Sequence, residues 1–208
     1  MPRCIQIFAK APIPGKVKTR MQPELDDEQC AELAKRLLHH SCQLAKEYRN
    51  GEIQLWCSPD TGHPYFFALA EKFPLTLFAQ RGEHLGQRMI NAMNNALDSG
   101  FQPLLIGADC PFFDNQYLDN AFKQLEQHDV VLGPATDGGY VLIGSNQILP
   151  KDILDEIAWG TANAMQQTIE QVSQRGLKCG LLEPLADIDR VQDLELLNPI
   201  GLLTSGVH

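Results

Sequence analysis

Short apolar runs alternate along the chain with longer segments in which apolar residues recur every three or four positions. The runs have the length and β-branched content of buried strands, and the longer segments have the period of amphipathic helices. We expect strands at 4–10, 52–58, 75–79, 103–108, 129–134, 139–144 and 178–182. The expected helices span 27–48, 84–98, 115–127 and 162–175. This alternation predicts an α/β fold with a mainly parallel sheet covered by helices.

One pair of expected strands should break the parallel pattern. The strands at 129–134 and 139–144 are separated by only a few residues, which include Gly138, and this is too short for a crossover helix. We therefore expect an antiparallel pair or a tight excursion, and a mixed sheet. Asp114 is a candidate N-cap for the helix that follows it, and Gly176 is a candidate stop for the last long helix.

The length of 208 residues suits one large domain, because single cores stop growing only near ~250–300 residues. The sequence has no repeated unit and no low-complexity stretch that would act as a linker. We expect a single domain over residues 1–200, followed by a tail at 201–208.

Cysteine usage, hydropathy and charge narrow the class of protein. The six cysteines are scattered without a CxxC pair, which is typical of reduced, mostly buried thiols in a cytoplasmic protein. No apolar run approaches the ~18 residues of a membrane-spanning helix, so we expect no membrane partner. The net charge of −9 argues against a broad nucleic-acid surface. The oligomeric state is not indicated.

Positive charge gathers in the first 23 residues, which hold five cations and no acid. Four of these cations lie in the run KAPIPGKVKTR (10–20), directly after the first expected strand, where open α/β sheets bind ligands. Pro12 and Gly15 turn the loop so that backbone N–H groups can point outward, an arrangement that holds phosphates. A solvated basic loop would explain the charges but not the Pro/Gly framework. The run matches neither the Walker pattern nor GxGxxG, which disfavours an ordinary ATPase or a dehydrogenase.

A carboxylate ends the expected strand in IGADCP (106–111). Asp109 would project from the carboxyl end of the sheet, and Mg²⁺ is usually held by one or two carboxylates together with phosphate oxygens. A helix N-cap is an equally good interpretation of this position. No histidine lies nearby in sequence to activate Cys110, which we expect to be a buried neighbour.

Two later segments add further candidates. In GPATDGGYVLIG (133–144), Asp137 precedes a Gly pair that permits close approach of a ligand, although a plain hairpin turn is the stronger interpretation of this segment alone. In ADIDRVQDL (186–194), alternation along an extended segment places Asp187 and Asp189 on the same side, and Asp193 can help to start a closing helix. An acidic surface turn would explain this second segment equally well. Smaller signals are Gln80, Gly82, Gly86 and Arg88, and Trp159 with Thr161.

The ordered set FAKAPIPGKVKTR, IGADCP, PATDGGYVLIG, AWGT and DIDRVQDL resembles the nucleotide-diphospho-sugar transferase superfamily. It looks most like the bacterial family of radical-SAM/selenodomain-associated transferases, often labelled glycosyltransferases. The resemblance runs from about residue 4 to residue 197. It implies a GT-A-like, three-layer α/β/α fold with a mixed, mainly parallel sheet.

The resemblance also implies roles for particular residues. The nucleotide-binding set would be Lys10, Pro12, Gly15, Lys18, Thr19, Arg20, Gln80 and Arg88. The substrate-binding set would be Asp137, Gly138, Gly139, Tyr140, Trp159 and Thr161. Mg²⁺, or Mn²⁺ in its place, would be held by Asp109 and Asp189, with Asp187 as a further candidate. The catalytic residues would be Lys18, Arg20 and Asp109.

Two departures from the superfamily pattern leave the transferred group open. The first loop lacks the usual Gly-Gly pair of nucleotidyltransferases, and residues 107–111 lack the DxD of many glycosyltransferases. The density of cations in the first loop favours nucleotidyl transfer from a nucleoside triphosphate to a small acceptor. The alternatives are glycosyl transfer from a nucleotide-sugar and a non-catalytic, nucleotide-binding partner protein.

Overall fold

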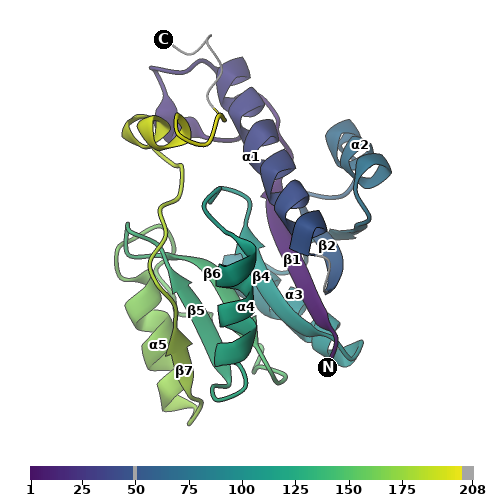
Figure 1. Ribbon diagram of the computed structural model, residues 1–208. Coiled ribbons are helices and arrows are strands. Elements are labelled where there is room, and N and C mark those ends of the chain that lie inside the picture. Colours follow the sequence, from purple (N-terminus) through teal and green to yellow (C-terminus); the bar gives the residue numbers. More distant parts are fainter. Residues whose placement is uncertain (49–50, 203–208) are drawn as a thin grey trace.

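A seven-stranded mixed sheet forms the centre of the protein, whose computed structural model describes residues 1–48 and 51–202 (Figure 1). The strand order is β3-β2-β1-β4-β6-β5-β7. Pairing is parallel except at β6, which runs antiparallel to both of its neighbours, β4 and β5. The expected mixed, mainly parallel sheet is therefore confirmed. The strands are β1 (Arg3–Lys10), β2 (Gly51–Ser58), β3 (Thr76–Ala79), β4 (Gln102–Gly107), β5 (Val130–Pro134), β6 (Tyr140–Ser145) and β7 (Cys179–Leu181).

Five α-helices and two short 3-10 helices connect the strands within the described residues. The α-helices are α1 (Asp27–Tyr48), α2 (Pro64–Lys72), α3 (Leu85–Asp98), α4 (Asn115–Gln124) and α5 (Ala164–Gln174), and the 3-10 helices are η1 (Thr19–Met21) and η2 (Val191–Leu197). Helix α2 was not expected, because its mostly apolar sequence has no clear helical period. Its signals are the proline at its first position and the N-cap His63, whose side chain accepts a hydrogen bond from the N–H of Tyr65.

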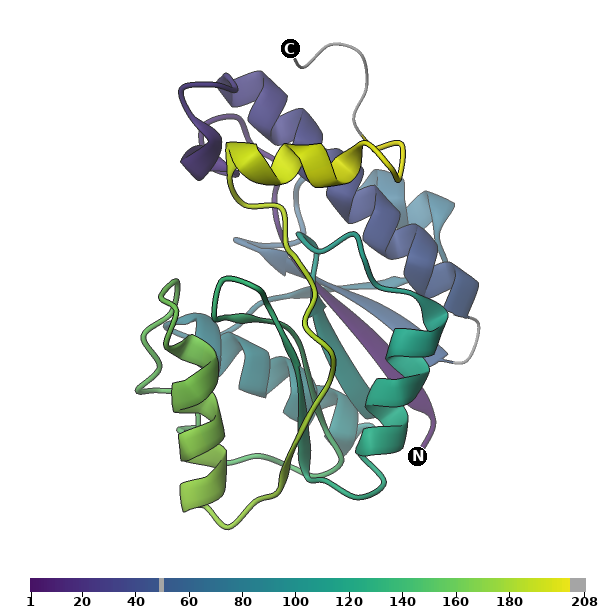
Figure 2. The same cartoon turned by 60° about the vertical axis from the view of Figure 1, so that its left-hand side comes forward.

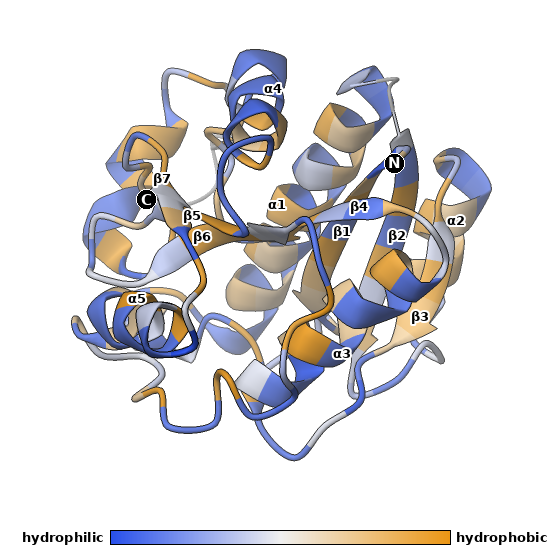
Figure 3. Cartoon of the chain, turned by 90° about the horizontal axis from the view of Figure 1, so that it is seen from below, coloured by the Kyte–Doolittle hydropathy of each residue, from blue (hydrophilic) through white to orange (hydrophobic). Residues whose placement is uncertain are grey.

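The helices cover both faces of the sheet and give the expected three layers (Figures 1 and 3). Successive strand residues point to opposite faces, so Ile5 and Ile7 pack under α1, α2 and α4. Leu105 and Ile143 pack on the other face, under α3 and α5. Figure 3 shows apolar residues gathering on the strands and on the helix faces turned towards them.

The C-terminal part of the chain crosses the molecule and returns to the first loop. After β7 it runs across the sheet to η2, which lies beside α1 (Figure 2). A third apolar cluster forms there, in which Ile188 and Leu197 pack against Met21 and Leu37. This cluster brings the segment that contains Asp187 and Asp189 next to the first loop. Of the expected tail, residues 203–208 lie outside the described part of the chain.

The expectations for two helix ends and for the cysteines are also confirmed. The carboxylate of Asp114 caps α4 by accepting a hydrogen bond of 2.6 Å from the N–H of Tyr117. Gly176 follows α5 with a positive φ of 72°. All six cysteines are free, and five of them are buried. Among the described residues, no helix combines the length and the apolar character that a membrane span requires.

Replacement of Gly86 by alanine tests the close approach of α3 to the loop after β6. A Cβ atom at Gly86 would lie 2.4 Å from the backbone carbonyl oxygen of Leu154. Although alanine favours helices, we expect Gly86→Ala to lower the free energy of unfolding by about 1–3 kcal/mol, because the backbone must shift. Urea unfolding measures this change. Asn95→Ala, at an exposed position of α3, should change stability by no more than about 0.5 kcal/mol, and an equal effect of both substitutions would contradict the packing.

Candidate active site

A cleft of about 450 Å³ opens at the carboxyl ends of β1 and β4. Its apolar wall includes Phe8 and Met89. Parallel strands leave their carboxyl ends at one edge of the sheet, which is where α/β folds bind ligands. Of the residues expected at the site, the cleft is lined by Lys10, Lys18, Thr19, Arg20, Gln80, Asp109, Tyr140 and Asp189.

The first loop forms one side of the cleft. It is tied to β2 by the N–H of Ala11, which donates to the carbonyl oxygen of Ser58 at 2.7 Å. Lys10 and Lys16 are exposed and line the cleft. Gly15 has a φ of 72°, and a Cβ atom there would lie 3.1 Å from the carboxylate of Asp27. The glycine therefore permits the turn and the close approach of the loop to α1. Neither Gly15 nor the buried Pro12 lines the cleft.

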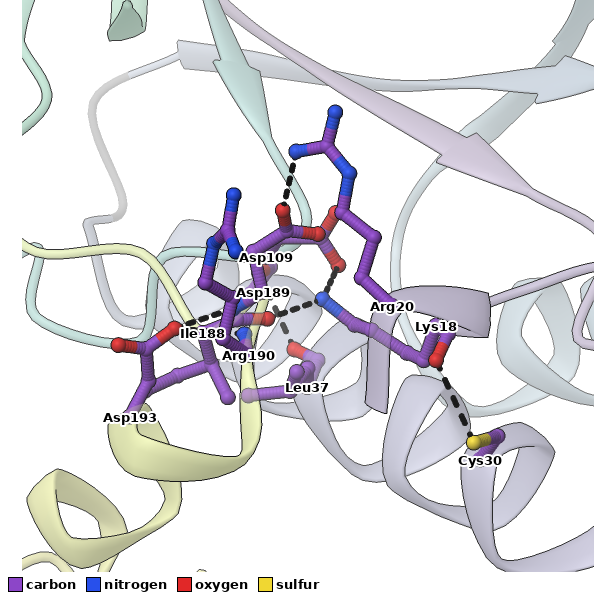
Figure 4. A network of polar contacts seen from close by, with 10 residues as sticks. Lys18, Arg20, Cys30, Leu37, Asp109, Ile188, Asp189, Arg190 and Asp193 are labelled. Carbon is purple, nitrogen blue, oxygen red and sulfur yellow. Dashed lines mark hydrogen bonds and ion pairs between the residues drawn. The ribbon is translucent and has the colours of Figure 1, made fainter. Parts of the chain in front are cut away.

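Lys18 is a buried cation within the basic loop. Its side chain is 4% exposed, and its Nζ atom lies 2.6 Å from the carboxylate of Asp109. The same ammonium group donates to the carbonyl oxygen of Ile188 (Figure 4). Lys18 thus joins the first loop both to the end of β4 and to the C-terminal segment.

The backbone at Lys18 is also unusual. Its φ of 53° and ψ of 29° are left-handed, which is uncommon for a residue other than glycine and is often found at functional sites. Thr19 follows in helical conformation. Within the described residues, the N–H groups of Lys18 and Thr19 donate no hydrogen bond. Successive N–H groups in alternating left- and right-handed conformations form a concave site for anions.

Arg20 binds the C-terminal segment and touches a loop that the sequence did not connect with it. Its Nη1 atom lies 2.7 Å from the carboxylate of Asp189 (Figure 4). A Cβ atom at Gly160 would lie 3.3 Å from its Nη2 atom. The AWGT segment therefore reaches the site through Gly160, a residue that sequence reasoning missed. The sequence feature that could have identified Gly160 is its position between the two expected residues Trp159 and Thr161.

The two aspartates of the C-terminal segment are positioned by the residue between them. Ile188 is fully buried in the third apolar cluster, and its N–H donates to the carbonyl oxygen of Asp109 at 2.9 Å. Asp189 lines the cleft, whereas Asp187, on the other side of Ile188 in the sequence, does not. Asp193 fixes the turn by accepting hydrogen bonds from the N–H groups of Asp189 and Arg190.

The pKa of Asp187 is raised by its surroundings. Burial raises its pKa to about 6, and the charges of Asp137, Asp189 and Asp109 add to the effect. Hard oxygen ligands at an exposed edge suit Mg²⁺. Within residues 1–48 and 51–202 no three acidic, histidine or cysteine side chains form a ready metal cage.

The turn between β5 and β6 lies beside this carboxylate group. Asp137 accepts a hydrogen bond of 2.9 Å from the N–H of Gly139. Gly138 has a φ of 92°, and a Cβ atom there would lie 2.4 Å from the carbonyl oxygen of Ala162. The Gly pair therefore allows the turn to pack against the AWGT loop. The aromatic rings of Tyr140 and Trp159 meet edge to face at 5.9 Å and support this contact.

Three of the expected residues have side chains that donate to backbone carbonyl oxygens. The Nε atom of Arg88 donates to the carbonyl oxygen of Gly82, and Arg88 does not line the cleft. The side-chain amide of Gln80 donates to the carbonyl oxygens of Ala9 and Trp56 at the ends of two strands. The hydroxyl group of Thr161 donates to the carbonyl oxygen of Ala158.

Cys110 has the environment of a packing residue. It is buried, and burial raises its pKa to about 12. A thiol of this kind is a poor nucleophile at neutral pH.

Several solved structures with this fold carry the names of enzymes that use nucleotides. A structure from Desulfovibrio desulfuricans G20, provisionally named a nucleotide-diphospho-sugar transferase, is 32% identical over 98% of this chain and 89% of its own, with a TM-score of 0.84. A cytidylyltransferase from Leptospira borgpetersenii is 16% identical over 100% and 90%, with a TM-score of 0.61. A CMP:2-keto-3-deoxy-manno-octonic acid synthetase in complex with CTP is 12% identical over 96% and 98%, with a TM-score of 0.55.

The chain thus has the fold of the nucleotide-diphospho-sugar transferases and cytidylyltransferases. The family model described as uncharacterized protein conserved in bacteria (DUF2064) matches residues 41–161, and the chain belongs to this family. No functionally curated protein matches the sequence.

Substitution of Asp187 by asparagine tests the electrostatic cost of the carboxylate group. The pKa of Asp187 rises from 3.8 to about 6 on folding. A raised carboxyl pKa means that the native state disfavours the charge, so this group destabilises the fold increasingly as pH rises from about 4 to about 6, and the full cost applies above that range. We expect Asp187→Asn to raise the free energy of unfolding by about 1–3 kcal/mol at pH 8 with EDTA present, and the gain should vanish below pH 4.

Urea unfolding at both pH values measures this effect. Asp98→Asn, at an exposed position at the end of α3, should show no comparable gain. A loss of stability in Asp187→Asn at pH 8 would show that the Asp187 charge is favourably paired.

Proposed function

We propose that the protein is a Mg²⁺-dependent nucleotidyltransferase, which transfers a nucleotidyl group from a nucleoside triphosphate to a small acceptor. The observation that carries this proposal is the cleft, which is lined by the exposed cations Lys10 and Lys16, by Lys18 and Thr19 of the first loop, and by the carboxylates Asp109 and Asp189. A triphosphate has several charges that such a loop can bind, and the carboxylates can share a metal with it. The names of the cytidylyltransferase and of the CTP complex with the same fold support this choice.

Each side of the cleft would have its own task. Lys10, Lys16 and the concave backbone at Lys18 and Thr19 would bind the triphosphate and stabilise the leaving pyrophosphate. Mg²⁺, or Mn²⁺, held by Asp109 and Asp189, would neutralise charge on the phosphates. Arg20 lies between the cations of the first loop and the carboxylates, and it would orient the α-phosphate that the acceptor attacks.

The reaction joins the acceptor and the nucleotide in one displacement. An acceptor hydroxyl oxygen forms a bond to the α-phosphorus, and the bond from the α-phosphorus to the bridging oxygen of the β-phosphate breaks. Pyrophosphate leaves with that electron pair, and the hydroxyl proton passes to solvent. Catalysis rests on positioning and charge stabilisation, because phosphoryl transfer requires little covalent help from the protein.

Glycosyl transfer from a nucleotide-sugar is a second candidate function. The provisional name of the structure that is 32% identical to this chain favours it. A nucleotide-sugar would then occupy the same cleft through its diphosphate. Binding of a nucleotide-sugar more tightly than any triphosphate, together with release of a nucleoside diphosphate, would favour this alternative over the first.

Removal of the exposed cations tests the binding of phosphates. We expect Lys10→Ala/Lys16→Ala to weaken triphosphate binding by about 10–100-fold, the effect of losing one or two hydrogen bonds to charged groups. Calorimetric titration with each nucleoside triphosphate and Mg²⁺ measures the affinity, and circular dichroism checks the fold. The matched control Lys123→Ala/Lys178→Ala removes two exposed cations outside the cleft and should bind like the wild type.

Release of pyrophosphate tests the reaction itself. Incubation of the wild type with a triphosphate, Mg²⁺ and a pool of metabolites should release pyrophosphate, and EDTA should stop the release. Silence with every triphosphate would exclude nucleotidyl transfer. Unchanged affinity in the Lys10/Lys16 variant would separately exclude the first loop as the phosphate site.

A further inference from the structure

The AWGT segment (158–161) forms a short flap beside the cleft, and both of its ends are fixed. Ile157 before it is buried. Ala162 after it lies against Gly138, where a Cβ atom would approach the carbonyl oxygen of Ala162 to 2.4 Å. Between these ends Trp159 is partly buried, and the other three residues are exposed. A change of conformation in the flap can therefore stay local.

Two residues that line the cleft contact the flap. The guanidinium of Arg20 lies over Gly160, where a Cβ atom would be 3.3 Å from its Nη2 atom. The ring of Tyr140 meets the ring of Trp159 edge to face, with 5.9 Å between the centroids. Gly160 has a φ of 77°, a left-handed conformation that glycine adopts without strain. The flap thus touches the site through one cation and one aromatic ring.

Arg20 connects the flap to the phosphates that the cleft would bind. Its Nη1 atom lies 2.7 Å from the carboxylate of Asp189, and its side chain is nevertheless 49% exposed. A phosphate group offers a guanidinium two parallel hydrogen bonds, as a carboxylate does, so a bound triphosphate competes with Asp189 for Arg20. A guanidinium that turns towards a phosphate leaves the surface of Gly160.

The indole N–H of Trp159 gives an independent reason to expect a second conformation of the flap. Its Nε1 atom is buried and has no hydrogen-bond partner among the described residues. A buried donor without an acceptor is costly, and most buried donors in native proteins have a partner. A rearrangement that exposes this N–H or gives it an acceptor recovers that cost, so the ligand has to supply less free energy for it.

We propose that the AWGT flap responds to the nucleotide through Arg20. Phosphates draw the guanidinium away from Asp189 and Gly160, and the flap rearranges into the space that the guanidinium leaves. The contact between Trp159 and Tyr140 then changes, so one wall of the cleft depends on whether the nucleotide is bound. The inference rests on the proposed binding of a nucleotide at the first loop and adds a conformational step to it.

Fluorine spectroscopy of the full chain tests this step. The chain has two tryptophans, Trp56 and Trp159, and labelling with 5-fluorotryptophan gives each of them a signal, which Trp159→Phe assigns. The protein is titrated with Mg²⁺ and the α,β-methylene analogues of ATP, CTP, GTP and UTP, which bind without transferring a nucleotidyl group. We expect the Trp159 signal to shift in step with the binding curve that calorimetry gives for the same analogue.

Arg20→Lys separates movement of the flap from a direct effect of the ligand on the signal. Lysine keeps the charge but lacks the planar fork that contacts Gly160, so most of the shift should be lost at saturating nucleotide. Gly160→Ala places a methyl group against the guanidinium and should also reduce the shift, without changing a residue that binds the ligand. Its matched control is Gly176→Ala, because Gly176 has a similar φ of 72° but no described atom within 4 Å of a Cβ atom. This control should show the full shift.

The outcomes separate the inference from the proposed function. A Trp159 shift that follows binding and falls in Arg20→Lys and Gly160→Ala, but not in Gly176→Ala, supports the inference. A signal that stays still while calorimetry shows binding overturns the inference alone, as does an equal shift in every variant. Binding of no analogue overturns both proposals. The expected shift without release of pyrophosphate from ordinary triphosphates refutes nucleotidyl transfer and leaves the response of the flap established.

Discussion

The ammonium group of Lys18 lies where three segments far apart in the sequence meet. It pairs with Asp109 at the end of β4 and donates to the carbonyl oxygen of Ile188 in the C-terminal segment. Its side chain is 4% exposed, whereas that of Asp109 is 58% exposed. An ammonium group has three donors, and leaving it buried without acceptors would be costly. This contact therefore holds Asp109 and the segment that carries Asp189 in place beside the first loop.

The same contact explains how so many carboxylates can gather without a ligand. Asp109 pairs with Lys18 and Asp189 pairs with Arg20, so each central carboxylate has a cation as its partner. Asp187 has no such partner of its own, and its pKa is raised. In our account a nucleotide brings anions that compete for Arg20, and Mg²⁺ brings a cation that competes for Asp189. Each ligand then releases the group that the other requires, so the two should bind with positive coupling.

Much of the fold and the position of the cleft could be predicted from local patterns. Strand and helix periods were sufficient for β1, β4 and α1. The antiparallel β5–β6 pair followed from the short connection between its strands. These features depend on residues close together in sequence, where periodicity carries the information.

The missed features depend on tertiary contacts. The sequence placed Lys18 in a basic loop after β1 but did not show that its side chain would be buried against the C-terminal segment. Gly160 was not singled out, because its contact with Arg20 joins residues 140 positions apart. The backbone acceptors of the Gln80 and Arg88 side chains could not be predicted either, because only the folded chain supplies them. Motif resemblance identifies such residues without showing which partner each side chain has.

The exchange of ion-pair partners in the cleft is tested most directly by the effect of Mg²⁺ on nucleotide affinity in Asp189→Asn. Calorimetric titrations with the tightest-binding triphosphate, with and without Mg²⁺, give this effect for the wild type and the variant. We expect Mg²⁺ to tighten binding by about tenfold or more in the wild type. In the variant, binding without Mg²⁺ should be tighter than in the wild type, because Arg20 has lost its competing carboxylate, and most of the Mg²⁺ effect should disappear. An equal Mg²⁺ effect in both proteins would contradict the account.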